Sequence, residues 1–188
     1  MYVCGKYLRE KGQLNGNTVV TTVMSNLGLY KSLEREGIDY EQTAVGDKYV
    51  AENMMENNYS IGGEQSGHII FSRYSATGDG ILTSLMIMEA CVDQKATLCD
   101  LAKEMKVYPQ LLRNVRVSDK KTALENEKVK ASIEAAAEAL GDDGRILVRE
   151  SGTEQLIRVM VEAGTDELCH KYVDSVVDVM EAEGLVVE

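Results

Sequence analysis

The chain has 188 residues, of which 44% are hydrophobic, and its formal net charge is −11. This size and composition suit one large or two small globular domains rather than a disordered chain. The acidic balance excludes sequence-independent nucleic-acid binding, because that affinity comes from basic side chains that neutralise backbone phosphates. Any basic site must therefore be local.

The four cysteines form no C-x-x-C pair, and only two histidines accompany them. We therefore expect reduced, mostly buried thiols rather than a zinc cage. The first residues carry charges and lack the apolar core of a signal peptide. No run reaches the roughly 18 apolar residues that a membrane span requires. A cytoplasmic protein that binds neither nucleic acid nor membrane is expected.

The first half of the chain alternates between strand and helix patterns. β-branched residues predict a strand over 17–23, and a helical pattern that ends at Gly37 follows it. A second strand is predicted over 40–45, and then a helix over 46–58 with Asp47 as its N-cap. This order indicates an α/β domain with a βαβ-type sheet.

A glycine-rich segment over 59–80 contains two short apolar runs. It predicts a hairpin, or a strand interrupted by a functional loop. The helix that follows has one apolar face, made of Ile81, Leu85, Met88 and Val92. We expect this methionine-rich stripe to lie in the core, because methionine fills irregular gaps well.

Pro109, the only proline, disfavours helix at the preceding residue and marks a domain boundary. Beyond it the pattern predicts a strand over 111–118 and a helix over 123–140 that ends at Gly141. Two strands and a final helix over 165–184 complete the chain. The order indicates a small α+β domain, with two helices on one face of an antiparallel sheet.

The stretch RESGTEQLIRV places a Ser-Gly-Thr turn between the two strands expected over 145–150 and 156–163. Backbone amides around a glycine can form an anion-binding nest, to which hydroxyl groups add donors. Antiparallel pairing would bring Arg149 and Arg158 to the mouth of this turn, and a guanidinium matches two phosphate oxygens. The pattern equally suits a solvated hairpin whose arginines pair with nearby glutamates.

The stretch GGEQSGHII gathers a carboxylate, a hydroxyl and an imidazole between glycines, from Glu64, Ser66 and His68. Sugar hydroxyls need such a mixture of donors and acceptors, and His68 can also carry a proton near neutral pH. Alternatively, Gly62 and Gly63 simply form a turn beside a satisfied, partly buried histidine. Ser66 is not a hydrolase nucleophile, because Glu64 stands where that motif needs glycine.

Four segments in this order resemble the carboxy-terminal half of the α-D-phosphohexomutase family: VGDKYV, GGEQSGHII, TGDGILT and RESGTEQLIRVMVEA. Members of that family have four domains, which carry in turn a phosphorylated serine, a Mg²⁺ site of D-G-D-x-D type, a sugar-binding loop and a phosphate-binding loop. Only the last two are complete here. The resemblance implies a tail of the second domain over 1–16, a sugar-binding α/β domain over 17–108 and a phosphate-binding α+β domain over 109–188.

The resemblance also implies which residues bind substrate. Those near the sugar would be Lys48, Glu64, Ser66 and His68, with His68 also a candidate acid or base. Those that hold the phosphate would be Arg149, Ser151, Gly152, Thr153 and Arg158. Lys48 stands where arginine is common, which keeps the charge but loses the fork. Glu150 and Gln155 replace residues that are often proline, so we expect a less rigid turn and a weaker phosphate site.

For amino sugars, the family reaction converts glucosamine 6-phosphate to glucosamine 1-phosphate through glucosamine 1,6-bisphosphate, a step towards amino-sugar nucleotides and cell-wall precursors. It needs a phosphoryl donor and Mg²⁺, neither of which this chain is expected to supply. The chain would then be inactive without the missing amino-terminal domains, as a piece of a longer enzyme, a shortened gene product or half of a split enzyme. A non-catalytic sugar-phosphate-binding module, or a specificity for glucose or mannose phosphates, is the alternative.

Overall fold

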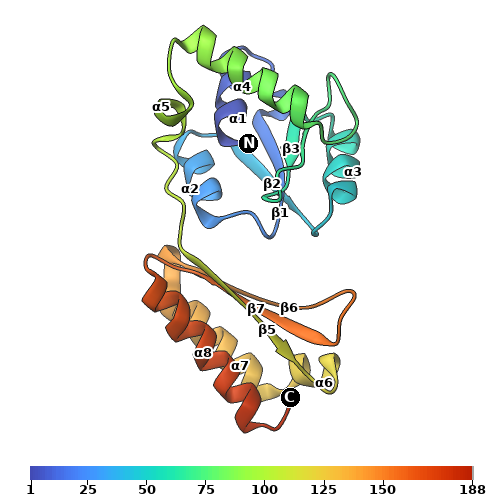
Figure 1. Cartoon of the computed structure of the whole chain (residues 1–188), viewed down its shortest axis with the longest axis vertical. Coiled ribbons are helices and arrows are strands. Elements are labelled where there is room, and N and C mark those ends of the chain that lie inside the picture. Colours follow the sequence, from blue (N-terminus) through green and yellow to red (C-terminus); the bar gives the residue numbers. More distant parts are fainter. Residues whose placement is uncertain (188) are drawn as a thin grey trace. The chain divides into compact units, whose positions relative to one another are not determined.

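The computed structural model describes residues 1–187, which divide into two compact units, unit 1 over 1–107 and unit 2 from Tyr108 onward (Figure 1). Each unit has its own sheet and its own core. The boundary lies one residue from the one that Pro109 predicted. Among the described residues, no helix is both long and apolar enough to cross a membrane.

Unit 1 is a mixed sheet with helices on both faces. Its elements are α1 (Tyr2–Glu10), a 3-10 turn (Asn15–Asn17), β1 (Thr18–Thr22), α2 (Leu27–Arg35), β2 (Asp39–Thr43), α3 (Asp47–Asn57), β3 (Ile61–Gly63), β4 (Ile69–Phe71), α4 (Gly80–Gln94) and α5 (Leu98–Ala102). The strand order is β2-β1-β3-β4. β1 is parallel to both neighbours, and β4 runs antiparallel to β3, so the predicted hairpin is present.

Alternate residues of β1 serve two cores, because successive side chains of a strand point to opposite faces. Val19 packs in the cluster that contains Leu33 of α2, whereas Val20 packs in the cluster that contains Met54 of α3. Gly62 lets α3 approach the sheet, because a Cβ there would lie 2.6 Å from the Met54 sulfur. Unit 1 is therefore a three-layer α/β/α sandwich (Figure 1).

Helix α1 belongs to the core of unit 1, which differs from the expected domain tail over 1–16. Cys4 and Leu8 are buried in the same cluster as Val19 of β1. Gly5 allows this close approach, since a Cβ there would lie 2.9 Å from a Val19 methyl group. The charges along this segment hid its short buried stripe from the sequence pattern.

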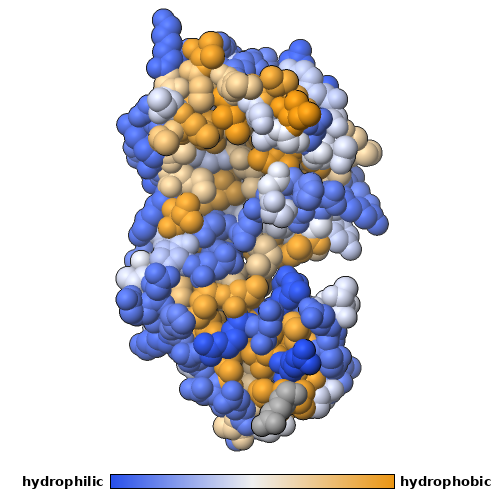
Figure 2. Space-filling view, viewed as in Figure 1, coloured by the Kyte–Doolittle hydropathy of each residue, from blue (hydrophilic) through white to orange (hydrophobic). Residues whose placement is uncertain are grey.

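Helix α4 turns the opposite side to the core from the one expected. Met86 and Ala90 are buried, whereas the predicted core stripe is 54 to 79% exposed: Ile81, Leu85, Met88 and Val92. Figure 2 shows hydrophobic side chains gathered over α4. The expectation was wrong because α4 is apolar nearly all round, so its periodicity does not select a face.

Two further expectations need correction at helix ends. The N-cap of α3 is Gly46, with φ of 135°, and Asp47 is the first helical residue without a capping bond. The helix expected over 123–140 is two helices that meet at Asn126. Asn126 ends the first and caps the second, because its side chain accepts the backbone N–H groups of residues 128 and 129.

Unit 2 is an antiparallel sheet covered by helices on one face. Its elements are β5 (Gln110–Arg116), α6 (Lys120–Glu125), α7 (Glu127–Leu140), a 3-10 turn (Gly141–Asp143), β6 (Arg145–Glu150), β7 (Leu156–Glu162) and α8 (Asp166–Ala182). The strand order is β5-β7-β6. Ile157, Val159 and Val161 of β7 share a buried cluster with residues of α7 and α8. The α+β architecture predicted for this part is confirmed.

The four cysteines are free thiols. Cys4 and Cys169 are buried, Cys91 is half-buried and Cys99 is exposed. Burial, which we expected for most of them, holds for two.

The two methionines of α4 give a matched test of its orientation. Met86→Ala should lower the free energy of unfolding of unit 1 by about 2 to 5 kcal/mol, because it leaves a cavity in the core. Met88→Ala should change it by no more than about 0.5 kcal/mol, because that side chain is exposed. Urea denaturation of both variants checks this, and a larger loss from Met88→Ala would contradict the orientation.

Candidate functional site

In unit 1 the predicted sugar-binding residues lie at the edge where the parallel strands end. The loops after β1, β2 and β3 meet at this edge. From β1 the chain moves to β2 on one side of it and then crosses over to β3 on the other side. α/β sheets bind ligands at such a switch point. Glu64, Ser66 and His68 follow β3, and Lys48 lies in the first turn of α3 after β2.

The loop that joins β3 to β4 is a tight turn. The Glu64 N–H donates to the His68 carbonyl oxygen at 2.9 Å, and the Gly67 N–H donates to the Glu64 carbonyl oxygen at 3.1 Å. Gly67 has φ of 101°, which favours glycine. Gly62 and Gly63 lie in β3, so the interpretation of that pair as the turn is wrong. The turn exposes the side chains of Gln65, Ser66 and His68.

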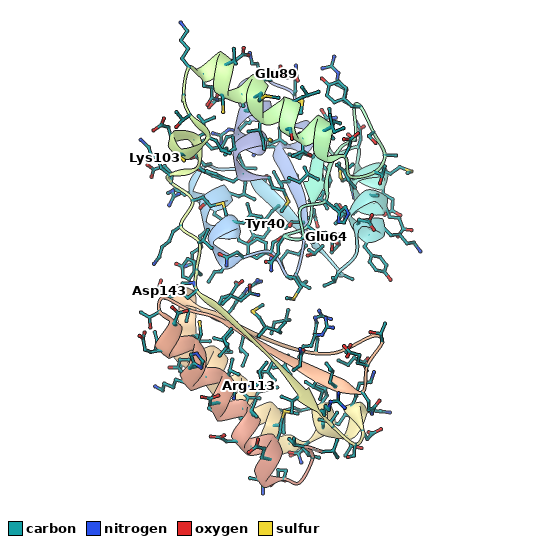
Figure 3. The ribbon with its side chains drawn as sticks, in the orientation of Figure 1. Tyr40, Glu64, Glu89, Lys103, Arg113 and Asp143 are labelled. Carbon is teal, nitrogen blue, oxygen red and sulfur yellow. The ribbon has the colours of Figure 1, made fainter. Side chains whose placement is uncertain are left out.

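The Glu64 carboxylate links two loops of this edge (Figure 3). Its Oε1 accepts the backbone N–H of Gly46 at 3.0 Å, which fixes the carboxylate while its Oε2 makes no hydrogen bond within residues 1–187. Ser66 Oγ and His68 Nδ1 lie 3.4 Å apart, and both side chains are exposed. The loop thus offers a fixed acceptor, a hydroxyl and an imidazole side by side.

Lys48 is a highly exposed member of the predicted sugar contacts. Its side chain is 74% exposed, and its Nζ lies 3.6 Å from Glu52 Oε1, one turn further along α3. An ion pair of this kind on a helix surface contributes little to stability. Lys48 therefore has the freedom to move to a ligand, and its role there stays a prediction.

In unit 2 the predicted arginines are direct neighbours across the β6–β7 ladder. Arg149 pairs with Arg158 in the register, and both are half-buried. They lie on the face opposite the helices, because their neighbours Val148, Ile157 and Val159 pack in the core. Like charges directly opposite each other in a sheet are destabilising. Burial, and then the positive charge of Arg158, lowers the pKa of Arg149.

Local carboxylates neutralise this pair only in part. Arg158 Nη2 lies 3.7 Å from Glu154 Oε2, but its buried Nε has no hydrogen-bond partner among the described residues. Arg149 forms no ion pair with any of residues 1–187. Glu162, one of the nearby glutamates, pairs with Arg145 at 2.7 Å instead. The interpretation as a self-neutralised hairpin therefore fits Arg158 partly and Arg149 not at all.

The loop between β6 and β7 is held by its own serine. Ser151 is buried; its N–H donates to the Leu156 carbonyl oxygen at 3.0 Å, and its Oγ accepts the Glu154 N–H at 3.3 Å. Gly152 and Thr153 are exposed. Gly152 has no positive φ, and a Cβ there would meet no atom within 4 Å. The fold itself therefore does not require glycine at this position.

The structure adds Lys120 to this loop, which the sequence analysis missed. Lys120 begins α6, and its Nζ donates to the carbonyl oxygens of Ser151 at 2.8 Å and Glu154 at 3.5 Å. The helix dipole disfavours a cation in the first turn of a helix. A lysine at this position is therefore the one sequence signal that could have pointed to Lys120. Gln155 also fastens the loop, because its Nε2 donates to the Ser118 carbonyl oxygen at 3.2 Å. Whether the turn is less rigid than with proline stays a prediction.

Comparison with known proteins gives the same family for both units. The family model for the α/β/α domain III of phosphoglucomutase/phosphomannomutase matches residues 1–108, and the model for the C-terminal domain matches residues 112–179. The chain is 59% identical to phosphoglucosamine mutase of Lachnospira eligens, over 100% of this chain and 42% of that protein. It is 58% identical to phosphoglucosamine mutase of Bacillus cytotoxicus, over 97% of this chain and 41% of that protein.

Solved structures of low sequence identity share the fold. A substrate complex of N-acetylglucosamine-phosphate mutase matches with a TM-score of 0.77 and 21% identity, over 95% of this chain and 42% of that chain. An N-acetylphosphoglucosamine mutase of Aspergillus fumigatus, in complex with glucose 1,6-bisphosphate, matches with a TM-score of 0.74 and 20% identity, over 98% and 42%. The chain spans about two fifths of the length of the relatives it matches.

The different surroundings of two arginines on β6 predict losses of stability of different size. Arg145→Met should lower the free energy of unfolding of unit 2 by about 3 to 5 kcal/mol, because it removes the guanidinium that pairs with the buried Glu162 carboxylate at 2.7 Å. Arg149→Met should lower it by less than about 1 kcal/mol, because it also removes the repulsion with Arg158. Urea denaturation without phosphate measures both, and similar losses would show that Arg149 is a structural residue.

Proposed function

The chain belongs to the phosphoglucomutase/phosphomannomutase family, and from that premise we propose that it is the sugar-binding and phosphate-binding part of a phosphoglucosamine mutase. The whole enzyme would convert glucosamine 6-phosphate to glucosamine 1-phosphate through glucosamine 1,6-bisphosphate. Relatives of that name at 54 to 59% identity support the amino-sugar substrate. The observation that carries the proposal is the pair of opposed, under-neutralised arginines beside an exposed Gly-Thr loop.

The β6–β7 hairpin suits the phosphate of a sugar phosphate. A dianion beside Arg149 and Arg158 would attract both guanidinium groups and thereby offset their mutual repulsion. The N–H groups of Gly152 and Thr153 donate no hydrogen bond within residues 1–187, so they are available to the same anion. Each hydrogen bond to a charged group contributes about 1.5 to 3 kcal/mol. A few such bonds suffice to hold a phosphate despite the net charge of −11.

The β3–β4 loop suits the sugar hydroxyls. One carboxylate oxygen of Glu64 is held by the Gly46 N–H. The other can accept a hydrogen bond from a sugar hydroxyl while the carboxylate stays in place. Ser66 can donate or accept, and His68 beside it can bond to the sugar or take the acid or base role that the resemblance implies. Lys48 would add a mobile positive charge.

The phosphoryl transfer itself would need other parts of the enzyme. Residues 1–187 contain no group of three or more His, Cys, Asp or Glu side chains that could hold a metal ion. A Mg²⁺ ion that assists the transfer would therefore be held by the amino-terminal domains, which would also supply the phosphoserine. In this proposal the chain binds hexosamine phosphates but does not turn them over alone.

Titration with inorganic phosphate and with glucosamine 6-phosphate tests the proposal. Arg149→Ala should weaken the binding of both ligands about 10- to 150-fold, because it removes charge-assisted bonds worth about 1.5 to 3 kcal/mol. Arg113→Ala is the matched control, since Arg113 pairs with Asp174 of α8 on the helix-covered side of the sheet. Isothermal titration calorimetry measures the affinities.

Two outcomes would contradict the proposal. The phosphate site would be excluded if the unaltered chain and Arg149→Ala bound phosphate equally. The mutase assignment would fail if the chain, mixed with the amino-terminal domains of a relative, bound ligand but never restored turnover. The chain would then be a binding module only.

Gly152 gives a test that separates ligand binding from folding. Gly152→Ala should leave the free energy of unfolding unchanged or raise it by up to about 1 kcal/mol, because its backbone conformation and open surroundings tolerate a methyl group. The same change should weaken phosphate binding at least about fivefold, because the methyl group occupies space that the anion needs. Calorimetry and urea denaturation measure the two effects, and unchanged affinity would exclude close approach of the anion.

A further inference from the structure

Lys120 contacts the β6–β7 loop, which is the proposed phosphate site, and these contacts contribute nothing to its own helix. Its side chain is only 22% exposed, and its Nζ contacts the carbonyl oxygens of Ser151 and Glu154 at opposite ends of the loop. Asp119 fixes the start of α6, because its Oδ1 accepts the Thr122 N–H at 2.6 Å. The ammonium group thus serves the loop, 31 residues further along the chain.

Peptide geometry converts this contact into an orientation of the loop amides. In a trans peptide unit the C=O and the N–H point in opposite directions, and the described residues contain no cis peptide bond. The Ser151 carbonyl points at the Lys120 ammonium. The N–H of Gly152, in the same peptide unit, must therefore point away from it. This N–H has no partner within residues 1–187.

We propose that Lys120 is a positioning residue of the phosphate site: it holds the Ser151 carbonyl inward and thereby presents the Gly152 N–H to the anion. This inference rests on the proposed function of the loop. Without the ammonium group, the peptide unit is free to turn its carbonyl oxygen outward, where it would repel a phosphate. Lys120 also lies 3.7 Å from the Glu150 carboxylate, so it offsets the negative charge that this residue adds to the loop.

Three variants of the whole chain separate this role from simpler ones. Lys120→Met removes the donors but keeps most of the length of the side chain, whereas Lys120→Arg keeps donors for both carbonyl groups. Lys121→Met is the matched control, because Lys121 is the next residue, is 80% exposed and pairs only with Glu125 at 3.8 Å among the described residues. Each is titrated with inorganic phosphate while the backbone amide signal of Gly152 is followed by NMR.

In the unaltered chain, phosphate should move the Gly152 amide signal downfield to a saturating value. Lys120→Met should weaken phosphate binding about tenfold, the loss expected for about 1.4 kcal/mol, and should also reduce the shift at saturation. Lys120→Arg should keep most of the affinity and the shift, and Lys121→Met should keep both. The shift at saturation is decisive, because a purely structural lysine would change stability without changing how the bound loop presents its amide.

The outcomes distinguish this inference from the proposed function. Absence of phosphate binding by the unaltered chain would remove the phosphate site itself. Normal binding by the unaltered chain, with the same saturating Gly152 shift in Lys120→Met, would overturn the role of Lys120 alone. Loss of the shift in Lys120→Arg as well as in Lys120→Met would show that donors to the carbonyl groups are not what orients the loop.

Discussion

The register of the β6–β7 ladder holds two like charges opposite each other, and the proposed phosphate site of unit 2 depends on this constraint. The register that pairs Arg149 with Arg158 is set on the other face of the sheet, where Ile157 and Val159 pack against helices. A slip of one residue would turn the arginines into the core and the aliphatic side chains into solvent. Hydrophobic burial therefore enforces an electrostatic repulsion, and an anion is the simplest species that relieves it.

Both candidate loops are fixed by bonds between a side chain and the backbone of a distant segment. In unit 1 the Glu64 carboxylate accepts the Gly46 N–H and joins the loops after β2 and β3. In unit 2 Lys120 and Gln155 join the corner after β5 to the β6–β7 loop. Such bonds hold irregular backbone in place where no ladder can, which is what a preorganised binding loop requires.

The sequence predicts features that depend on local patterns and misses those that depend on partners far along the chain. Strand alternation and a short turn were enough to bring Arg149 opposite Arg158. The prediction for α4 was wrong because both of its sides are apolar, so its packing against α1 and β4 decides which side is buried. Lys120 could not be found by spacing, because nothing in a run of 31 residues indicates that its ammonium group returns to Ser151.

In the proposed function, each loop must serve a substrate that is held in two orientations. Guanidinium groups and backbone amides recognise phosphate oxygens and are indifferent to the sugar carbon that carries them. The free oxygen of Glu64 can accept from whichever hydroxyl is presented, because vicinal hydroxyls of a hexose look alike from either end. A site that relied on one group specific for a single hydroxyl would favour one orientation. It would slow the binding of the bisphosphate in the other orientation. The composition of each loop therefore agrees with the proposed role in binding hexosamine phosphates.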